Sequence, residues 1–360
     1  MTARHPTLAW PTAGTAAQAL RRRAMAAVMN LVGGLVGGLG SLAVMGLAAA
    51  PQAAHAQSPA ATKGELRIGF QKYGTLTLLK ARGDLDKALA ARGITVKWIE
   101  FPAGPQLLEG LNVGSIDFGT TGEAPPVFAQ AAGADLVYVA NQPPAPTAEA
   151  IVVTRDSPIR SVADLKGRKV ALNKGSNVHY LLVKALEKHG LKYSDIQPVF
   201  LPPADARAAF ERGSVDAWAI WDPFLAAAQK QLGVRTVVDG RGLVANHQFY
   251  LAARGYAQRN PQTLQAVIDA LARVDAWAQA NPAEVAKLLA PQIGLDAATT
   301  ELAASRFAYG IKPISSAVAA EQQKIADAFH GLKLIPRPIR IADALATPAA
   351  APKVAQATPR

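Results

Sequence analysis

The stretch 114-GSIDFGTTGEAPP-126 joins a short apolar segment to a loop of glycines, hydroxyls and one carboxylate, and ends in two prolines. Glycine lets the backbone approach a ligand closely, and proline is favoured in the first turn of a helix. We therefore expect a strand at 115–119, an open loop after it, and a helix that begins near Pro125. A plain surface turn is the alternative, and the rest of the chain has to decide between them.

A second stretch, 213-GSVDAWAIWDPF-224, repeats this pattern about a hundred residues later. The earlier segment 66-LRIGFQKYGTLTLLKA-81 is repeated at a similar offset by 170-VALNKGSNVHYLLVKA-185. Two pairs in the same order favour two lobes of like construction. Asp117 and Asp216 follow the same Gly-Ser pair, which predicts a shared structural role.

Apolar segments of strand length alternate with amphipathic helical segments, beginning with a strand at 65–70 and a helical pattern at 75–93. This alternation predicts an α/β fold with parallel strand pairing. Residues 64–345 are enough for two lobes of ordinary size. In open α/β sheets ligands bind outside the carboxyl ends of the strands, where loops lead into helix N-termini, and GTTGEAPP is predicted to be such a loop.

The N-terminal segment has the order of a secretory signal. Three arginines at 21–23 precede an apolar run at 24–50, and Ala54-His55-Ala56 offers a small-x-small cleavage site. We expect residues 1–56 to be removed on export. The alternative is a retained transmembrane anchor. The Ala- and Pro-rich segment 346–360 is expected to be disordered.

Composition excludes several classes of site. Residues 1–56 contain four arginines and no acid, so the remainder carries 34 basic and 26 acidic residues, a net charge of +8 without a basic block. This disfavours a nucleic-acid surface and suits a small anionic ligand. The chain has no cysteine, so disulfides and thiolate sites are excluded. The histidines lack metal-ligand spacing, and we expect no metal and no cofactor.

The candidate binding residues follow predicted strands. Backbone N–H groups at helix N-termini bind anions, and two facing termini would hold one compact anion between the lobes. Hydroxyls and amides there add donors, although they could equally be helix caps without a ligand. The alternative for Glu123 is that its charge complements a helix dipole and binds no ligand. The candidates in this group are Gln71, Thr120, Thr121, Gly122, Glu123, Ser176 and Asn177.

Two further candidates end the repeated strand. Trp221 could supply an apolar wall, or belong to an ordinary core together with Trp218 and Phe224. Asp222 precedes Pro223, where a turn or helix start is the simpler interpretation. The chain has no G-x-S-x-G elbow, Walker loop or distinctive carboxylate pair, so catalysis finds little support and we expect no catalytic residue.

Long collinear segments, 68–83, 100–141, 157–187 and 213–229, resemble the aliphatic-sulfonate-binding proteins of bacterial ABC importers. The resemblance covers nearly all of residues 65–345. It implies a type II periplasmic binding fold of two α/β lobes joined by two crossover strands and closing on the ligand. Wider relatives of the family bind taurine, nitrate or thiamine precursors, so the resemblance indicates the fold more specifically than it indicates the solute.

The resemblance implies capture of an alkanesulfonate in the periplasm and its delivery to a membrane permease for sulfur acquisition, by a protein expected to be monomeric. The alternatives are a taurine- or nitrate-type receptor, or a secreted enzyme of sulfur metabolism. We expect lobe 1 at 65–157 and 244–345 and lobe 2 at 158–243, with the crossings in 149–158 and 246–255.

A sulfonate is a permanent anion with three acceptor oxygens, which hydroxyl, amide and backbone donors satisfy. Glu123 would repel it, and could point outward, pair with Lys174 or meet a ligand amine. Since no histidine belongs to this site, the sequence predicts that affinity changes little between pH 6 and 9.

Overall fold

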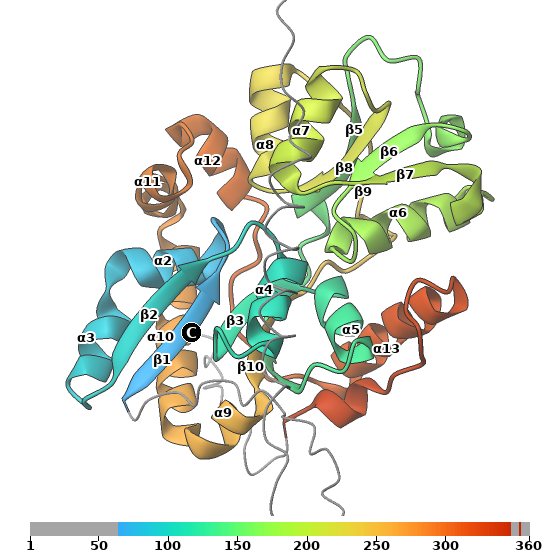
Figure 1. Cartoon of the computed structure of the whole chain (residues 1–360). Helices are drawn as coiled ribbons and strands as arrows, with labels where there is room; N and C mark the ends of the chain where they lie inside the picture. The colour runs from blue at the N-terminus through green and yellow to red at the C-terminus, as the bar shows by residue number, and fades with distance from the viewer. Residues whose placement is uncertain (1–63, 347–352, 354–360) are drawn as a thin grey trace, which may run out of the picture. The chain divides into compact units, whose positions relative to one another are not determined.

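The structure, a computed structural model, describes residues 64–346 and Lys353 (Figure 1). The predicted signal segment at 1–56 lies outside the described residues, and so does the predicted tail except for Ala346 and Lys353. None of the helices in the described part of the chain is both long and apolar enough to cross a membrane.

Lobe 1 is built on a sheet with the strand order β2-β1-β3-β10-β4. β1 pairs parallel with β2 and β3, whereas β10 pairs antiparallel with β3 and β4. Its strands are β1 (Glu65–Phe70), β2 (Thr95–Glu100), β3 (Phe118–Gly122), β4 (Leu136–Asn141) and β10 (Gln248–Ala253). The helices assigned to this lobe are α2 (Gly74–Arg82), α3 (Asp84–Ala90), α4 (Gly104–Asn112), α5 (Ala124–Ala131), α9 (Arg254–Arg259), α10 (Pro261–Ala280), α11 (Pro282–Ile293), α12 (Ala297–Ala304), α13 (Ser316–Gly331) and the short η5 (Ile341–Ala344).

Lobe 2 is built on a second sheet with the order β7-β6-β8-β5-β9. β6 pairs parallel with β7 and β8, and β5 pairs antiparallel with β8 and β9. Its strands are β5 (Glu149–Val153), β6 (Lys169–Leu172), β7 (Gln197–Phe200), β8 (Ala217–Trp221) and β9 (Arg235–Asp239). Its helices are α6 (Asn177–Lys188), α7 (Pro203–Glu211) and α8 (Phe224–Ala227), with the 3-10 helices η2 (Val162–Leu165) and η3 (Tyr193–Asp195) and the π-helical segment η4 (Ala228–Leu232).

The two sheets have one topology, which confirms the prediction of two lobes of like construction. β1 and β3 hold the places in the first sheet that β6 and β8 hold in the second. Asp117 accepts a hydrogen bond from the backbone N–H of Arg67 at 2.9 Å, and Asp216 accepts the equivalent bond from Lys169 at 2.7 Å. Each aspartate therefore fixes the strand that follows it to the start of the neighbouring strand, which is the predicted shared role.

The crossings between the lobes differ from the predicted ones. β5 lies wholly in the second sheet, although residues up to 157 were expected in lobe 1. Its residues are fully buried between β8 and β9, so the chain passes into lobe 2 before Glu149, through residues 142–148 and the turn η1 (Pro146–Ala148). The chain returns through residues 240–247, and the strand within the second predicted crossing, β10, belongs to the sheet of lobe 1.

The lobes contact each other on two sides. On one side, Tyr180 and Val183 of α6 pack in the same apolar cluster as Val127 of α5 and Phe329 of α13. On the other side, α12 of lobe 1 lies against α8 of lobe 2, as Figure 1 shows. One contact is thus apolar, and the other includes charged groups that are described below.

Candidate ligand site between the lobes

A small cavity lies where the two lobes meet, and its volume is about 20 Å³. Lobe 1, lobe 2 and both connecting segments contribute to its wall. The lining residues are Gln71, Tyr73, Gly104, Gly122, Pro125, Ala148, Ser176, Asn177, Trp221, Asp222, Asn246, Gln248 and Phe307.

Five helix N-termini converge on this cavity. The lining residues include the first residues of α4 and α6, the second residue of α5, and residues just before α2 and α8. Such termini carry unpaired N–H groups and the positive end of the helix dipole, which favours an anion. The α8 terminus is the exception, because Asp222 accepts the N–H of Ala226. The two facing termini of the sequence analysis were those of α5 and α6. Pro125 and Pro126 lack N–H groups, so α5 supplies fewer donors than expected.

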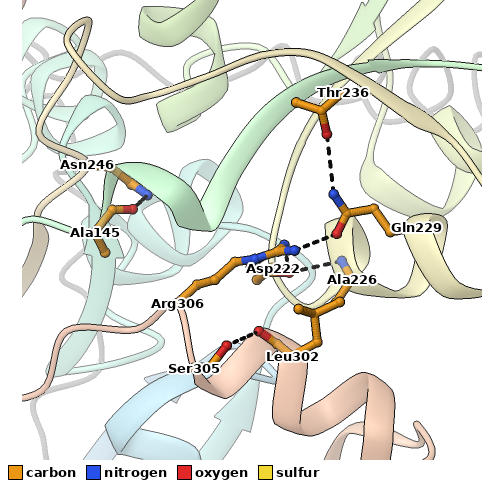
Figure 2. Close-up of polar contacts among 9 residues, drawn as sticks. All are labelled: Ala145, Asp222, Ala226, Gln229, Thr236, Asn246, Leu302, Ser305 and Arg306. Carbon is orange, nitrogen blue, oxygen red and sulfur yellow. Dashed lines mark hydrogen bonds and ion pairs between the residues drawn. The ribbon is translucent and has the colours of Figure 1, made fainter.

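Gly122 and Asn177 bring the lobes together at the cavity. A Cβ on Gly122 would overlap the side-chain amide of Asn177, so glycine is required here for close approach and not for an unusual backbone conformation. Asn177 donates through Nδ2 to Asn246 of the returning segment. Asn246 in turn donates to the backbone carbonyl of Ala145 in the outgoing segment at 2.8 Å (Figure 2). Asn177 is therefore connected to both segments that join the lobes.

Gln71 belongs to a polar chain within lobe 1. Its Nε2 donates to the Tyr73 hydroxyl at 3.2 Å and to the backbone carbonyl of Thr120 at 3.1 Å. The Tyr73 hydroxyl donates to Gln248 Oε1 at 2.8 Å, which leaves the Gln248 amide NH₂ group for another acceptor. The Tyr73 ring stacks on Phe307 with centroids 5.6 Å apart. Gln71 thus lines the cavity, but its amide N–H groups are taken by Tyr73 and Thr120 of its own lobe.

The hydroxyls predicted to bind the ligand make contacts within their own lobes. β3 spans 118–122, later than the predicted strand, because β10 pairs with it as far as Gly122. Thr120 donates to the carbonyl of Phe249 and Thr121 to that of Gly122, and neither lines the cavity. Ser176 does line it, at the N-cap position of α6, but its hydroxyl donates to the carbonyl of Asn173 at 2.7 Å and makes no cap bond.

Glu123 and Glu149 are buried carboxyls that do not line the cavity, although their chain neighbours Gly122 and Ala148 do. Glu123 is 2% exposed and accepts from the backbone N–H of His247 at 3.0 Å, so it neither points outward nor pairs with Lys174. Burial raises the pKa of Glu123 to about 7. Glu149 is fully buried, and both its carboxyl oxygens lack a hydrogen-bond partner. Burial, with the nearby charge of Glu123, raises the pKa of Glu149 well above its usual value.

Trp221 lies at the end of β8 and contacts two spaces. It lines the small cavity and also an adjoining groove of about 210 Å³. Gln71 and Tyr73 line both spaces as well. Phe224 packs edge-on against the Trp221 ring with centroids 6.0 Å apart. The groove lies between the lobes, and its other lining residues are Lys72, Glu100, Phe101, Pro102, Pro202, Pro203, Ala204, Pro223 and Phe224. Trp218, in contrast, is 1% exposed in the core of lobe 2.

Asp222 pairs with an arginine of the other lobe. Its carboxylate receives Arg306 Nη1 at 3.1 and 3.3 Å, and the backbone N–H of Ala226 at 2.9 Å (Figure 2). Arg306 also donates through Nη2 to Gln229 Oε1. Burial raises the pKa of Asp222 to about 7, against the opposing effect of Arg306.

His179 is structural. Its ring lies among aromatic side chains of both lobes, including Phe128 and Phe329, and hydrogen bonds the Tyr193 hydroxyl. Burial lowers the pKa of His179 to about 3, so the imidazole is neutral. Within residues 64–346 and at Lys353, no group of three or more His, Cys, Asp and Glu side chains could hold a metal ion.

Sequence reasoning missed several of the residues around the cavity. Asn246 and Gln248 lie in the segment that was expected only to cross between lobes. Glu149 was placed in a crossing too, and Arg306 and Phe307 follow a helix far along the chain with no motif. Only Tyr73 had a signal, since it follows the first strand beside Gln71.

Known proteins resemble this chain over most of its length. A family model described as NMT1/THI5 like matches residues 89–285. A protein of Escherichia coli (strain K12) named as an aliphatic sulfonates-binding protein is 51% identical over 278 residues, which are 77% of this chain and 86% of that protein.

Two solved structures share the fold. The alkanesulfonate-binding protein SsuA from Xanthomonas axonopodis pv. citri, bound to MOPS, has a TM-score of 0.75 and 43% identity, covering 79% of this chain and 99% of that chain. The periplasmic aliphatic sulphonate binding protein SsuA from Escherichia coli has a TM-score of 0.71 and 48% identity, covering 79% and 98%. With its two lobes of matching topology, this chain therefore belongs to the family of aliphatic-sulfonate-binding proteins of ABC importers.

Proposed function

We propose that this protein captures aliphatic sulfonates outside the cytoplasmic membrane and delivers them to the permease of an ABC importer. The observation that carries the proposal is the convergence of the N-termini of α2, α4, α5 and α6 on one interlobe cavity. Their N–H groups, with the amides of Asn177 and Gln248, offer donors to an anion that accepts hydrogen bonds and donates none. The relatives named for sulfonate binding support the same ligand class.

The lobes have to separate for a ligand to enter. A cavity of about 20 Å³ has room for about one water molecule, and an alkanesulfonate is larger. We propose that the sulfonate head binds between the α6 terminus and the Tyr73–Gln248 pair, and that the lobes close again around it. Capture of this kind needs no covalent step, so we propose a binding protein and not an enzyme.

The adjoining groove is the proposed site of the alkyl chain. Apolar side chains from both lobes line it, and it begins at Trp221, where the cavity ends. A chain lying there would remove apolar area from water, which stabilises the complex by roughly 25 cal/mol per Å². Longer alkanesulfonates are therefore expected to bind more tightly than methanesulfonate.

Trp221→Ala is expected to weaken octanesulfonate binding by about tenfold, since it removes roughly 50 Å² of apolar contact. Its effect on methanesulfonate is expected to be smaller, because that ligand does not reach the groove. Val113→Ala, which truncates an exposed apolar side chain away from the site, is the control. An equal loss for both ligands would contradict the assignment of the groove.

Calorimetry of the purified protein against methane-, ethane- and octanesulfonate, taurine, sulfate and nitrate tests the function. Binding heats are expected with the alkanesulfonates, and weaker or no binding with sulfate and nitrate. A strict preference for taurine would instead assign the site to an amine-bearing sulfonate, with Glu123 as the amine's partner. No binding to any sulfonate, or release of a reaction product, would contradict the proposal.

The remaining assignments are proposals as well. We propose that residues 1–56 are a signal peptide and that the rest acts as a monomer in the periplasm. Lobe 1 then spans about 65–148 and 244–345, and lobe 2 spans 149–243. N-terminal sequencing of the exported protein tests the cleavage site.

A further inference from the structure

The second interlobe contact is polar and borders the candidate site. Arg306 follows α12 of lobe 1, and Figure 2 shows its guanidinium reaching Asp222 and Gln229 of lobe 2. Gln229 is held in turn by Thr236 at 3.3 Å. Asp222 and Phe307, the neighbour of Arg306, both line the cavity. The ion pair therefore lies between the lobes and next to the proposed ligand.

The Asp222 side chain is fully buried, whereas that of Arg306 is 17% exposed. A buried carboxylate next to the site of an anion would repel it strongly, because few water molecules screen the charge. Arg306 is the charged group that faces Asp222 directly. Its guanidinium cancels this repulsion only while lobe 1 lies against lobe 2.

The two sides of the interlobe contact differ in the cost of opening. Separating α6 from α5 and α13 would expose apolar side chains such as Val183 and Phe329 to water. Separating Arg306 from Asp222 exposes two charged groups that water solvates well. The lobes should therefore open on the side of α8 and α12.

We propose that Arg306 is a positioning residue that couples sulfonate capture to lobe closure, by bringing its charge across the cleft to Asp222 only when the lobes are closed. The proposal rests on the proposed function in one respect, namely that the ligand is an anion. In the open form Asp222 lacks its partner. Closure pairs Asp222 with Arg306, removes its repulsion of the ligand and holds the closed lobes together.

The first test measures ethanesulfonate affinity by calorimetry at pH 6 and pH 8. Arg306→Gln is expected to lower affinity by about 30-fold at pH 8, the lower end for truncating one partner of a buried charge pair. The loss should be smaller at pH 6, where the unpaired Asp222 is protonated. Arg306→Lys should recover part of the loss, because the charge remains without the planar fork. The control Arg273→Gln makes the same change of net charge at an exposed position on α10.

The double variant Arg306→Gln/Asp222→Asn separates a charge effect from a loss of folding. It removes the unpaired carboxylate, so it should recover more than half of the lost binding free energy and lose the extra pH dependence of Arg306→Gln. Glu123 and Glu149 are present in the wild type and in every variant, so comparison with the wild type removes the effect of their titration. A double variant as weak as Arg306→Gln, or an Arg306→Gln variant as tight as wild type at pH 8, would overturn the proposal.

A second test needs no ligand, so it tests the role of Arg306 in closure even if the proposed function is wrong. The chain has no cysteine, and Lys72→Cys with Ala204→Cys places one spin label on each lobe across the groove. Arg306→Gln in the labelled protein should shift the ligand-free distance distribution towards longer values than Arg273→Gln does. Identical distributions would overturn the role of Arg306 in closure. Failure of the wild type to bind any sulfonate would overturn only the proposed function and the role of Arg306 in ligand affinity.

Discussion

Replacing Gly122 by alanine is expected to lower sulfonate affinity by about 100-fold while the protein remains folded. The added Cβ would occupy the position of the Asn177 amide, which belongs to the other lobe. Overpacking of this kind costs roughly 1–3 kcal/mol, and each 1.4 kcal/mol is tenfold in affinity. The cost falls on lobe closure, since Gly122 and Asn177 belong to different lobes.

Two matched variants test this explanation. Gly331→Ala makes the same change at the end of α13, where a Cβ meets no atom within 4 Å, and is expected to bind like wild type. Asn177→Ala removes the group that the new methyl would strike, so adding Gly122→Ala to it should cost much less than Gly122→Ala alone. Calorimetry gives the affinities, and circular dichroism melting shows whether each variant is folded. Equal costs of Gly122→Ala in both backgrounds would contradict the steric explanation.

The fold could be predicted because the sequence repeats its own local pattern. The pair GSIDFG and GSVDAW marks equivalent strands, and Asp117 and Asp216 make the same backbone contact in both lobes. These features depend on residues close in sequence, or on an aspartate that binds the neighbouring strand of the sheet. The crossing was harder to predict, because β5 is fixed by antiparallel pairing with β8 and β9, whose residues come more than 60 positions later.

Part of the cavity lining was predictable for the same reason. Gly122, Ser176, Asn177, Trp221 and Asp222 follow repeated strands and do line the cavity, as does Gln71. Thr120 and Thr121 do not, because β10 extends the ladder through them. Nothing in a local pattern reveals such pairing.

Buried charge was the part that the sequence described least well. Glu123 was a carboxylate of uncertain direction, and Glu149 and Arg306 were not considered for the site. Their importance comes from burial and from partners more than 80 residues away, such as His247 for Glu123 and Asp222 for Arg306. The prediction of pH-independent binding failed to take these groups into account.

Sulfonate affinity is now expected to fall by about 30-fold between pH 6 and pH 8.5, since each carboxyl that ionises can change binding by up to tenfold per pH unit. The pKa of Glu123 is raised to about 7 by burial, with a contribution from Glu321 and against the backbone N–H groups of His247 and Asn246. A sulfonate beside these carboxyls is a further negative charge, which raises their pKa again and favours the protonated form. Binding is therefore strongest below pH 7, takes up protons near pH 7, and weakens as the pH rises through the pKa of the free protein.

Calorimetry in buffers of different ionisation enthalpy measures this proton uptake directly, because the ligand itself does not titrate. Glu123→Gln removes a carboxyl whose pKa is raised to about 7, so it should reduce the fall of affinity between pH 6 and 8.5. Glu109→Gln, at an exposed position on α4, makes the same charge change away from the cavity. Its affinity should depend on pH as that of the wild type does. If the affinity of the wild type did not change over this range and no protons were taken up near pH 7, the buried carboxyls would not sense the ligand. Asn177, Gln248 and the helix termini would then account for binding on their own.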